Sequence, residues 1–534
     1  MTSNNNIWLE SRKYGDVQMD LAYQILEDLR AGTSLRQAVH AHHLPEGGYI
    51  PKHVLVYAYR EQLETGEWEE DPGLLEKLRM KPVRTLSGVT TVTVLTKPYP
   101  CPGKCIFCPT DTRMPKSYLP DEPGAMRALH HEFDPFEQTS ARIEALEAIG
   151  HPTDKIELLI LGGTWSAYQR DYQRWFIKRC LEALNGEDSD SLEEAQDLNQ
   201  SAQHRNVGMV IETRPDHIDS DEIANLRALG VTKIQMGIQS LDDRILGLNH
   251  RGHTVAQAHQ AMRWMRAAGF KIVLHWMPNL LGATLETDRY DFQRLWSDVN
   301  MRPDEIKIYP CLLLENAELY EYWQRGEYQP YTTEELFKLI VDIKTDIPEY
   351  CRVNRIIRDI PSTNIVEGNK RTSLRQDVQR ELAKRGERCR CIRCREVRKE
   401  SFDPDRLALK DLEYPTGGAQ EHFLSFVTPD DRIAGFLRLS LPGSDAPDTG
   451  LTELDGAAVV REVHVYGQSL EVGTESDQAA QHSGLGKRLM DQAETLAQDV
   501  GYKRIAVIAA LGTRGYYDRL GYALDGTYMV KELR

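Results

Sequence analysis

Three things are scarce in this sequence, namely cysteine, long apolar runs and net positive charge. Nine cysteines in 534 residues are too few for the disulfide framework of a small secreted protein. No uncharged apolar run approaches the roughly 20 residues that a membrane-spanning helix needs. The opening MTSNNNIWLE lacks the basic and apolar regions of a signal peptide. We therefore expect a cytoplasmic protein with no membrane association, and the length suggests two or three domains.

A net charge of −16 argues weakly against a nucleic-acid partner, but the charge is unevenly distributed. Residues 351–399 carry 15 Lys and Arg against 6 Asp and Glu, a local net charge of +9. The acidic excess lies elsewhere, notably in residues 67–76 and 185–197. A basic segment in an acidic chain is either a nucleic-acid contact or a solvated helix face, and charge alone leaves both open.

Alternating strand and helix patterns occupy the middle of the chain. Six apolar segments are each followed by a helical pattern, and they lie at residues 89–95, 156–161, 208–213, 233–239, 271–277 and 305–310. Their nearly continuous apolar character is typical of parallel strands that are covered on both faces. The predicted fold is α/β, with a partial (βα)6 TIM-type barrel whose functional loops follow the strands.

The patterns before and after the barrel differ from it. The first 80 residues show the apolar spacing of helices. The C-terminal part contains a hairpin pattern at 422–442, a strand pattern at 456–467, and then a helix and a strand. These changes predict four regions: a helical N-terminal region 1–80, a barrel 81–350, a basic linker 351–400 and a second α/β domain 401–534.

Three cysteines, Cys101, Cys105 and Cys108, lie in the loop that follows the first predicted strand. Structural zinc takes four ligands, usually in two spaced pairs, and this loop holds no histidine. A redox Cys-x2-Cys pair would leave Cys101 without a role. Three thiolates on one loop suit a [4Fe–4S] cluster with one iron left open. With Pro102 and Gly103 in the loop, the motif resembles that of the radical S-adenosylmethionine (SAM) superfamily, in which the open iron binds SAM.

Residues at the ends of the next predicted strands are expected to face the same cavity. Gly162 and Gly163, in LGGTW, resemble the superfamily motif that approaches the SAM amino group, with a plain turn as the alternative. Glu212 in ETRPD and Gln239 in GIQS are candidates for SAM contact, because the ends of barrel strands form the site.

A glycine motif marks the C-terminal domain. QHSGLG, residues 481–486, opens a predicted helix, where Gly484 and Gly486 would let backbone N–H groups meet a pyrophosphate. The order of strand, helix and strand around this motif, with GYYDRLGY after it, resembles the GNAT acetyltransferase fold, which binds acetyl-CoA. Tyr516 and Tyr517 lie where such enzymes often place a tyrosine near the CoA thiolate, and core packing is the alternative for either.

The pairing of these two domains resembles the family of the Elongator catalytic subunit, the tRNA uridine-34 acetyltransferases. The resemblance covers about residues 80–534 and rests on segments such as PCPGKCIFCP, SYLPDEPGAMRAL, MGIQSLDDRILGLNHRGHT and RGYYDRLGYALDGTYMVKEL. It implies that a 5′-deoxyadenosyl radical abstracts a hydrogen from the acetyl methyl group of acetyl-CoA. The carbon radical then adds to C5 of the wobble uridine of tRNA, and thioester hydrolysis leaves a carboxymethyl group.

The resemblance also implies roles for individual residues. Cys101, Cys105 and Cys108 would bind the cluster, and acetyl-CoA would be bound by Lys155, Glu462, Val463, His464, Gly484, Leu485, Gly486 and Tyr517. The implied catalytic residues are Tyr517, Tyr516 and Lys155. The first gap of the cysteine motif is three residues here and wider in eukaryotic members. This suggests a bacterial or archaeal enzyme that needs no accessory subunits, and a homodimer stays open.

A second cysteine cluster lies within the basic segment. Cys389, Cys391 and Cys394 predict a structural zinc site, for which Cys311 is the first candidate as fourth ligand and Cys351 the second. Three free thiols, or a second iron–sulfur cluster, are the alternatives.

Arginines around this cluster are candidate tRNA contacts, together with the N-terminal region, and they are Arg352, Arg355, Arg358, Arg390 and Arg393. Two other classes of function remain open at this point. One is a protein lysine acetyltransferase that uses the barrel as a scaffold, and the other is a non-enzymatic RNA-binding protein. The intact three-cysteine loop disfavours the lysine acetyltransferase, because a scaffold has no use for such a loop.

Overall fold

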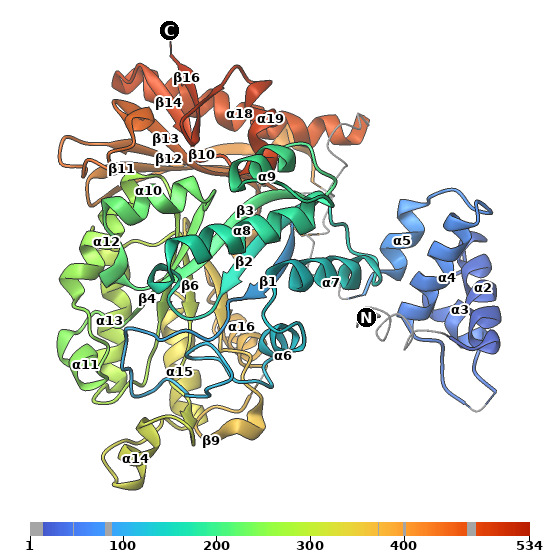
Figure 1. Cartoon of the computed structure of the whole chain (residues 1–534), viewed down its shortest axis with the longest axis horizontal. Coiled ribbons are helices and arrows are strands. Elements are labelled where there is room, and N and C mark those ends of the chain that lie inside the picture. Colours follow the sequence, from blue (N-terminus) through green and yellow to red (C-terminus); the bar gives the residue numbers. More distant parts are fainter. Residues whose placement is uncertain are drawn as a thin grey trace.

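Two seven-stranded sheets and a small helical body make up the computed structural model (Figure 1). It describes residues 14–45, 47–80, 88–371, 373–398, 402–466 and 477–533. The helical body is blue in Figure 1 and contains α2 (Asp16–Arg30), α3 (Leu35–Ala41), α4 (Lys52–Glu64) and α5 (Pro72–Leu78). Its apolar faces bury a core of their own, as the helical spacing predicts.

The first sheet is wholly parallel, as predicted for a TIM-type barrel. Its strands, in spatial order, are β1 (Thr90–Leu95), β2 (Lys155–Leu161), β3 (Arg205–Thr213), β4 (Lys233–Gln239), β5 (Lys271–Trp276), β6 (Glu305–Ile308) and β8 (Arg352–Ile356). The sheet stays open because β1 and β8 do not pair. One strand more than the six expected is present, since β8 falls in the stretch that the sequence pattern assigned to the linker.

Helices accompany the strands of this sheet. They are α6 (Pro123–His130), α7 (Pro135–Glu147), α8 (Arg170–Asn185), α9 (Leu192–Asn199), α10 (Ser220–Ala228), α11 (Asp243–Leu248), α12 (Val255–Ala267), α13 (Leu285–Ser297), α15 (Thr333–Ile343), α16 (Leu374–Lys384) and α17 (Ile392–Arg395), while α14 (Leu319–Gln324) stands away from the sheet (Figure 1). Threonine capping boxes start α12, α13 and α15, which fixes where these helices leave the strand-end loops.

The strands of the barrel have one apolar and one polar face, which corrects the expectation of continuously apolar strands. In β4, for example, Ile234, Met236 and Ile238 pack into the core under the helices, whereas Gln235 and Gln239 line an internal cavity. Side chains alternate between the two faces of a strand. The interior of the barrel is therefore largely polar, in contrast to the packed apolar interior of most TIM-type barrels.

The second sheet lies at one end of the barrel (Figure 1, orange to red). Its spatial order is β10 (Ala408–Thr416), β11 (Ala419–Val427), β12 (Ile433–Pro442), β13 (Ala457–Val465), β14 (Arg504–Val507), β16 (Tyr528–Glu532) and β15 (Ala523–Asp525). Helices α18 (Asp477–Val500) and α19 (Arg514–Asp518) belong to this domain, and a short pair of strands, β7 (Leu313–Leu314) and β9 (Ile365–Glu367), stands apart.

Two strands of the second sheet splay apart. β13 and β14 pair in parallel only from Ala457 opposite Arg504 to Val460 opposite Val507, while β13 continues to Val465. A bulge at Arg461 interrupts the pairing of β13 with β12. The splay opens a gap between β13 and β14 beyond Val460, where β13 is paired with β12 alone. No helix among the described residues is both long and apolar enough for a membrane span.

Candidate functional site

One cavity of about 1120 Å³ connects the two domains. At one end it is lined by Cys108 and Gln239, where the barrel strands finish. At the other end it is lined by His464 and Tyr517 of the second domain, beneath the first residues of the barrel strands. The predicted cluster loop and the predicted acetyl-CoA residues thus open into one space.

The three-cysteine loop follows β1, as the sequence predicts. Cys105 is buried, while Cys101 and Cys108 are half-buried. The Sγ of Cys101 lies 3.6 Å from Oγ1 of Thr164 and accepts a hydrogen bond from the N–H of Gly103 at 3.4 Å. Among the described residues these three thiols do not form a group within 4.8 Å of one another, unlike the second cluster. Cys105 and Cys108 share a hydrogen bond, so Cys101 is the thiol that lies apart from the other two.

Cationic side chains surround this loop. Arg251 donates from Nη1 to the Sγ of Cys105 at 3.4 Å, and Arg214 lies so close to Gly103 that a Cβ there would clash with it. Buried nitrogens of Arg214, Arg251 and His253 have no hydrogen-bond partner. Unpaired buried donors are rare, so these fit an anionic group held by the loop. Hydrogen bonding from Cys108 and the charge of Arg251, against the effect of burial, lower the pKa of Cys105 to about 5.

The predicted SAM-binding residues divide into two kinds. Gly162 and Gly163 have φ of 147° and 93°, and a Cβ on Gly162 would overlap Thr96, so the turn requires glycine and packs beside the cysteine loop. Glu212 and Gln239 line the cavity. Gln239 has a φ of 66°, unusual for a non-glycine residue, and its buried Oε1 has no partner.

A chain of polar side chains continues along the inner wall of the barrel, across the adjacent strands β4, β5 and β6. Tyr118 donates from its hydroxyl to Glu212 at 2.9 Å, and His275 Nδ1 lies 3.5 Å from the same carboxylate. His275 Nε2 is 3.0 Å from Oε1 of Gln235, which also accepts a hydrogen bond from Lys307. Burial lowers the pKa of Lys307 to about 8 and the pKa of His275 well below its usual value. None of Tyr118, Gln235, His275 and Lys307 was predicted from the sequence.

His275 makes stability depend on pH. Burial, with Lys307, Arg358 and Arg251 nearby, keeps the folded-state pKa well below 6.5. As pH falls below 6.5, His275 is protonated in the unfolded chain but stays neutral in the folded chain. Acid therefore lowers the free energy of unfolding. Relative to His275→Gln, the wild type should lose up to about 2 kcal/mol between pH 6.5 and 5, measured by urea unfolding. The exposed His130→Gln variant is the control, and a pH-independent difference for His275→Gln would contradict the assignment.

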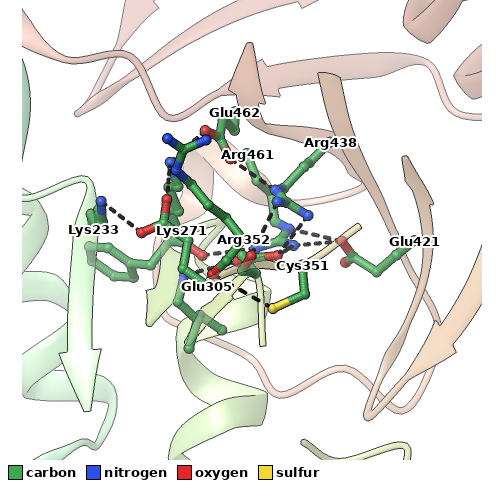
Figure 2. A network of polar contacts seen from close by, with 12 residues as sticks. Lys233, Lys271, Glu305, Cys351, Arg352, Glu421, Arg438, Arg461 and Glu462 are labelled. Carbon is green, nitrogen blue, oxygen red and sulfur yellow. Dashed lines mark hydrogen bonds and ion pairs between the residues drawn. The ribbon is translucent and has the colours of Figure 1, made fainter. Parts of the chain in front are cut away.

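A network of buried charges lies at the junction of the domains (Figure 2). Lys233 and Lys271 contact the two oxygens of Glu305 at 2.9 and 2.8 Å, and Lys271 also pairs with Glu462 of β13. Arg438 pairs with Glu462 at 2.9 Å. The network therefore joins the first residues of β4, β5 and β6 to the second sheet.

A second part of this network is completely buried. Arg461, the bulged residue of β13, donates to both oxygens of Asp304 at 2.8 and 2.6 Å and to Glu421 at 3.0 Å. The side chains of Arg461, Asp304 and Glu421 are all 0 % exposed. Asp304 precedes β6, so this ion pair fixes the two domains to each other.

The predicted acetyl-CoA residues of the second domain lie around the splay of β13 and β14. Glu462, Val463 and His464 line the cavity along β13, and Tyr517 lines it from α19. Tyr516 points elsewhere, because a Cβ on Gly486 would lie 2.8 Å from its hydroxyl, which is buried and unpaired. Tyr517 is thus the tyrosine that faces the cavity.

The glycine motif differs from its expected position. α18 begins at Asp477, so Gly484, Leu485 and Gly486 lie inside the helix and not at its N-terminus. Good helix formers in DQAAQ, which precede the motif, extend the helix upstream. The side chains of residues 477–483 lie outside the described ones. Lys155, the first residue of β2, is half-buried beside Asp154, with 3.8 Å between their charged atoms.

The second cysteine cluster is compact. The Sγ atoms of Cys389, Cys391 and Cys394 lie within 4.8 Å of one another. Tetrahedral zinc with ~2.3 Å bonds would set them roughly 3.8 Å apart. Cys311 is not in this group, which corrects its choice as the fourth ligand, because it packs in the apolar cluster that contains Cys105. The buried Lys344 lies there instead, with Nζ 3.9 Å from the Sγ of Cys391.

The predicted tRNA arginines lie in different environments. Arg352 pairs with Glu396 at 2.7 Å, and Arg358 bonds to Ser117 and Glu122, so both are engaged within the protein. Arg390 is exposed beside Glu349. Arg355, which pairs with Asp359, and Arg393, which donates to the carbonyl of Asn354 at 3.0 Å, line the cavity near the open edge between β1 and β8. Arg127, Arg142 and Arg398 line the same cavity and were not predicted.

Family models match most of the barrel and the second domain. The radical SAM superfamily model matches residues 99–292, and a radical SAM C-terminal domain model matches 303–384. The model of the GNAT acetyltransferase family matches residues 390–522.

Several named relatives align with most of this chain. The tRNA uridine(34) acetyltransferase of Methanocaldococcus infernus is 44% identical and aligns over 87% of this chain and 89% of its own. The chain belongs to the tRNA uridine(34) acetyltransferase family. The member from Dehalococcoides mccartyi is 43% identical over 84% of this chain and 99% of its own, and human Elongator complex protein 3 is 36% identical over 86% and 87%.

A solved structure of the family agrees with the fold. The archaeal M. infernus Elp3 with residues 1–46 deleted has a TM-score of 0.72 and 40% identity, covering 84% of this chain and 100% of that one. The predicted fold class and family are therefore confirmed. The individual site residues stay predictions. The interior residues that were missed could have been found from the alternation of polar and apolar residues in strands such as KIQMGIQ.

Proposed function

We propose that this protein uses radical SAM chemistry and acetyl-CoA to install a carboxymethyl group at C5 of uridine 34 of tRNA. The observation that carries the proposal is the one cavity that runs from the three-cysteine loop to the acetyl-CoA residues of the second domain. A hydrogen abstraction between the two sites requires such a shared space. The names of the relatives support the choice of tRNA uridine 34 as substrate.

The residues of this chain fit the required groups. Cys101, Cys105 and Cys108 would hold a [4Fe–4S] cluster, and the nearby Arg251 would offset its negative charge. When bound, the cluster and SAM supply the radical that takes hydrogen from the acetyl methyl group. Glu212 and Gln239 would contact SAM, and Tyr517 would face the thioester from the second domain.

Anchoring of CoA in the second domain needs a change in α18. The N–H groups of Gly484 and Gly486 lie within the helix here, so they would become available to a pyrophosphate only if the turns before them unwind. The backbone of β13 at Glu462–His464, exposed by the splay, would bind the pantetheine amides. Lys155, at the entrance of β2, would contact acetyl-CoA from the barrel side.

Anaerobic reconstitution tests the proposed function. The full chain is loaded with iron and sulfide and combined with SAM, reductant, acetyl-CoA and tRNA, and nucleosides are analysed by mass spectrometry. Uridine 34 should gain the mass of a carboxymethyl group. If the cluster is intact by spectroscopy and no such nucleoside forms, the proposal is wrong. Acetylated lysine in a protein substrate, formed equally well by chain without a cluster, would favour the lysine acetyltransferase alternative.

The open edge between β1 and β8 is the proposed entry for tRNA, because Arg355 and Arg393 line it. Phosphate contacts make binding depend steeply on salt. Arg355→Ala and Arg393→Ala should each weaken tRNA binding and reduce the slope of log affinity against log salt by about 0.7 to 0.9. Filter binding at several salt concentrations measures this. The exposed Arg380→Ala on α16 is the control, and unchanged slopes would place the tRNA elsewhere.

We also propose zinc at Cys389, Cys391 and Cys394, with the ammonium of Lys344 offsetting the charge of the thiolates. The purified chain should contain stoichiometric zinc by elemental analysis. Cys391→Ser should lose the metal and unfold more easily, since structural zinc contributes to folding. Cys180→Ala, which changes a buried cysteine of α8, should keep it. A zinc-free wild type would contradict this site.

Localisation in the cytoplasm and action without accessory subunits are part of the same proposal. Both are supported by the archaeal and bacterial relatives, which align over almost their whole length.

A further inference from the structure

The interior of the barrel is hollow and polar along its length. Thr93 of β1, Glu157 of β2, Gln235 of β4, His275 of β5, Lys307 of β6 and Asn354 of β8 all line the cavity. The strands also contribute apolar lining residues, namely Leu95, Leu159, Leu161, Val207 and Gly208. Barrels of this type normally fill their interior with layers of branched apolar side chains. We call this interior the bore. Close packing of the barrel does not account for its open, polar character, because a packed interior leaves few voids.

The two ends of the bore lie at the two halves of the proposed reaction. Cys108 and Gln239 line the end at the C-terminal edge of the strands. Lys233, Lys271 and Glu305, the first residues of β4, β5 and β6, line the other end. Glu462 reaches Lys271 from the second domain, so the acetyl-CoA residues lie directly at this entrance.

The dimensions match one part of acetyl-CoA. β4 has seven residues, so the bore is about 20 Å long at ~3.3 Å per residue. The acetyl-pantetheine arm has about fifteen chain atoms, equal to roughly five residues of extended backbone or ~17 Å. The arm also carries two amides and a hydroxyl group, which need polar partners when they leave water. Gln235 and Asn354 provide amide groups in the bore.

We propose that the bore is the passage for the acetyl-pantetheine arm, which enters between the domains and presents its acetyl group to the cysteine loop. The ligand class is a thioester-ended pantetheine chain, and the inference rests on the proposed use of acetyl-CoA. The open edge between β1 and β8 is left for the nucleic acid. The two substrates then reach the radical site by separate routes.

Alkylation by bromoacetyl-CoA tests this route. The reagent places an electrophilic carbon where acetyl-CoA has its methyl group. In the full-length Thr93→Cys variant, the introduced thiolate attacks that carbon, a C–S bond forms and bromide leaves. Peptide mass spectrometry distinguishes a CoA adduct on the introduced cysteine from adducts on the native cysteines. Thr33→Cys, at a half-buried threonine of the N-terminal helical body, is the matched control.

Labelling of Thr93→Cys by bromoacetyl-CoA should be at least tenfold faster than that of Thr33→Cys, after each rate is divided by its rate with bromoacetamide. Excess acetyl-CoA should suppress it. Reaction with bromoacetamide but not with bromoacetyl-CoA would overturn the proposal, and so would reaction with neither reagent, since the bore would then be closed. The assay needs no cluster and no tRNA. Its failure is therefore distinguishable from a failure of the proposed function, which is read in tRNA nucleosides.

Discussion

The Cys105→Ala variant should lose SAM cleavage and tRNA modification completely. Two remaining thiols in the loop cannot hold three irons of a [4Fe–4S] cluster, so no open iron is presented to SAM. Iron content, release of 5′-deoxyadenosine and nucleoside mass spectrometry should all fall to background. Acetyl-CoA affinity, measured by calorimetry, should change by less than about twofold, a difference of about 0.4 kcal/mol, because the second domain is untouched.

Cys311→Ala is the matched control for this prediction. Cys311 is as buried as Cys105 and packs in the same apolar cluster, but it lies outside the three-cysteine motif. It should keep iron and activity. If Cys105→Ala still modifies tRNA, the loop does not have the assigned role. If both variants lose the iron–sulfur cluster, packing of the apolar side chains matters more than ligation by Cys105.

The Arg461→Met variant should lose about 3–5 kcal/mol of stability. The guanidinium bonds Asp304, Glu421 and the carbonyl oxygen of Phe270, and it is 0 % exposed. Without it, two carboxylates stay buried with too little positive charge. Urea unfolding followed by circular dichroism measures the loss. Methionine retains most of the volume of arginine, so the effect comes from charge and hydrogen bonds more than from a cavity.

Two further variants separate this effect from a general weakness of the second domain. Arg504→Met removes partly exposed ion pairs to Asp525 and Glu532 and should cost no more than about 1 kcal/mol. Arg461→Met combined with Asp304→Asn should recover part of the loss, because one of the unmatched charges is gone. If the free energy of unfolding of Arg461→Met in urea lies within about 1 kcal/mol of the wild-type value, the ion pair of Arg461 and Asp304 does not hold the domains together.

The sequence was sufficient for the parts of the site that are local. Cys101, Cys105 and Cys108 are adjacent in the chain, and the repeated strand and helix patterns placed their loop after β1. The hairpin of β11 and β12 also follows from its pattern. Local spacing is what determines such features, so a pattern within a few residues predicts them.

Other parts depend on contacts between distant residues. Arg461 pairs with Asp304 across 157 positions, and neither residue stands out in its own segment. Lys344 occupies the position beside Cys389, Cys391 and Cys394 that was expected for Cys311, because the C-terminal end of α15 lies beside Cys391. The polar bore was visible in principle, but only when strands such as KIQMGIQ are read residue by residue. Their average apolar character concealed the alternation.

The interface between the domains has a consequence for how this enzyme can be divided. Asp304 belongs to the barrel and its arginine to the second domain, and Tyr350 stacks on Tyr414 across the same boundary with 4.0 Å between ring centroids. Cutting the chain near residue 402 would leave each half with unmatched charges and an exposed aromatic surface. We therefore expect that neither half folds stably when it is produced without the other.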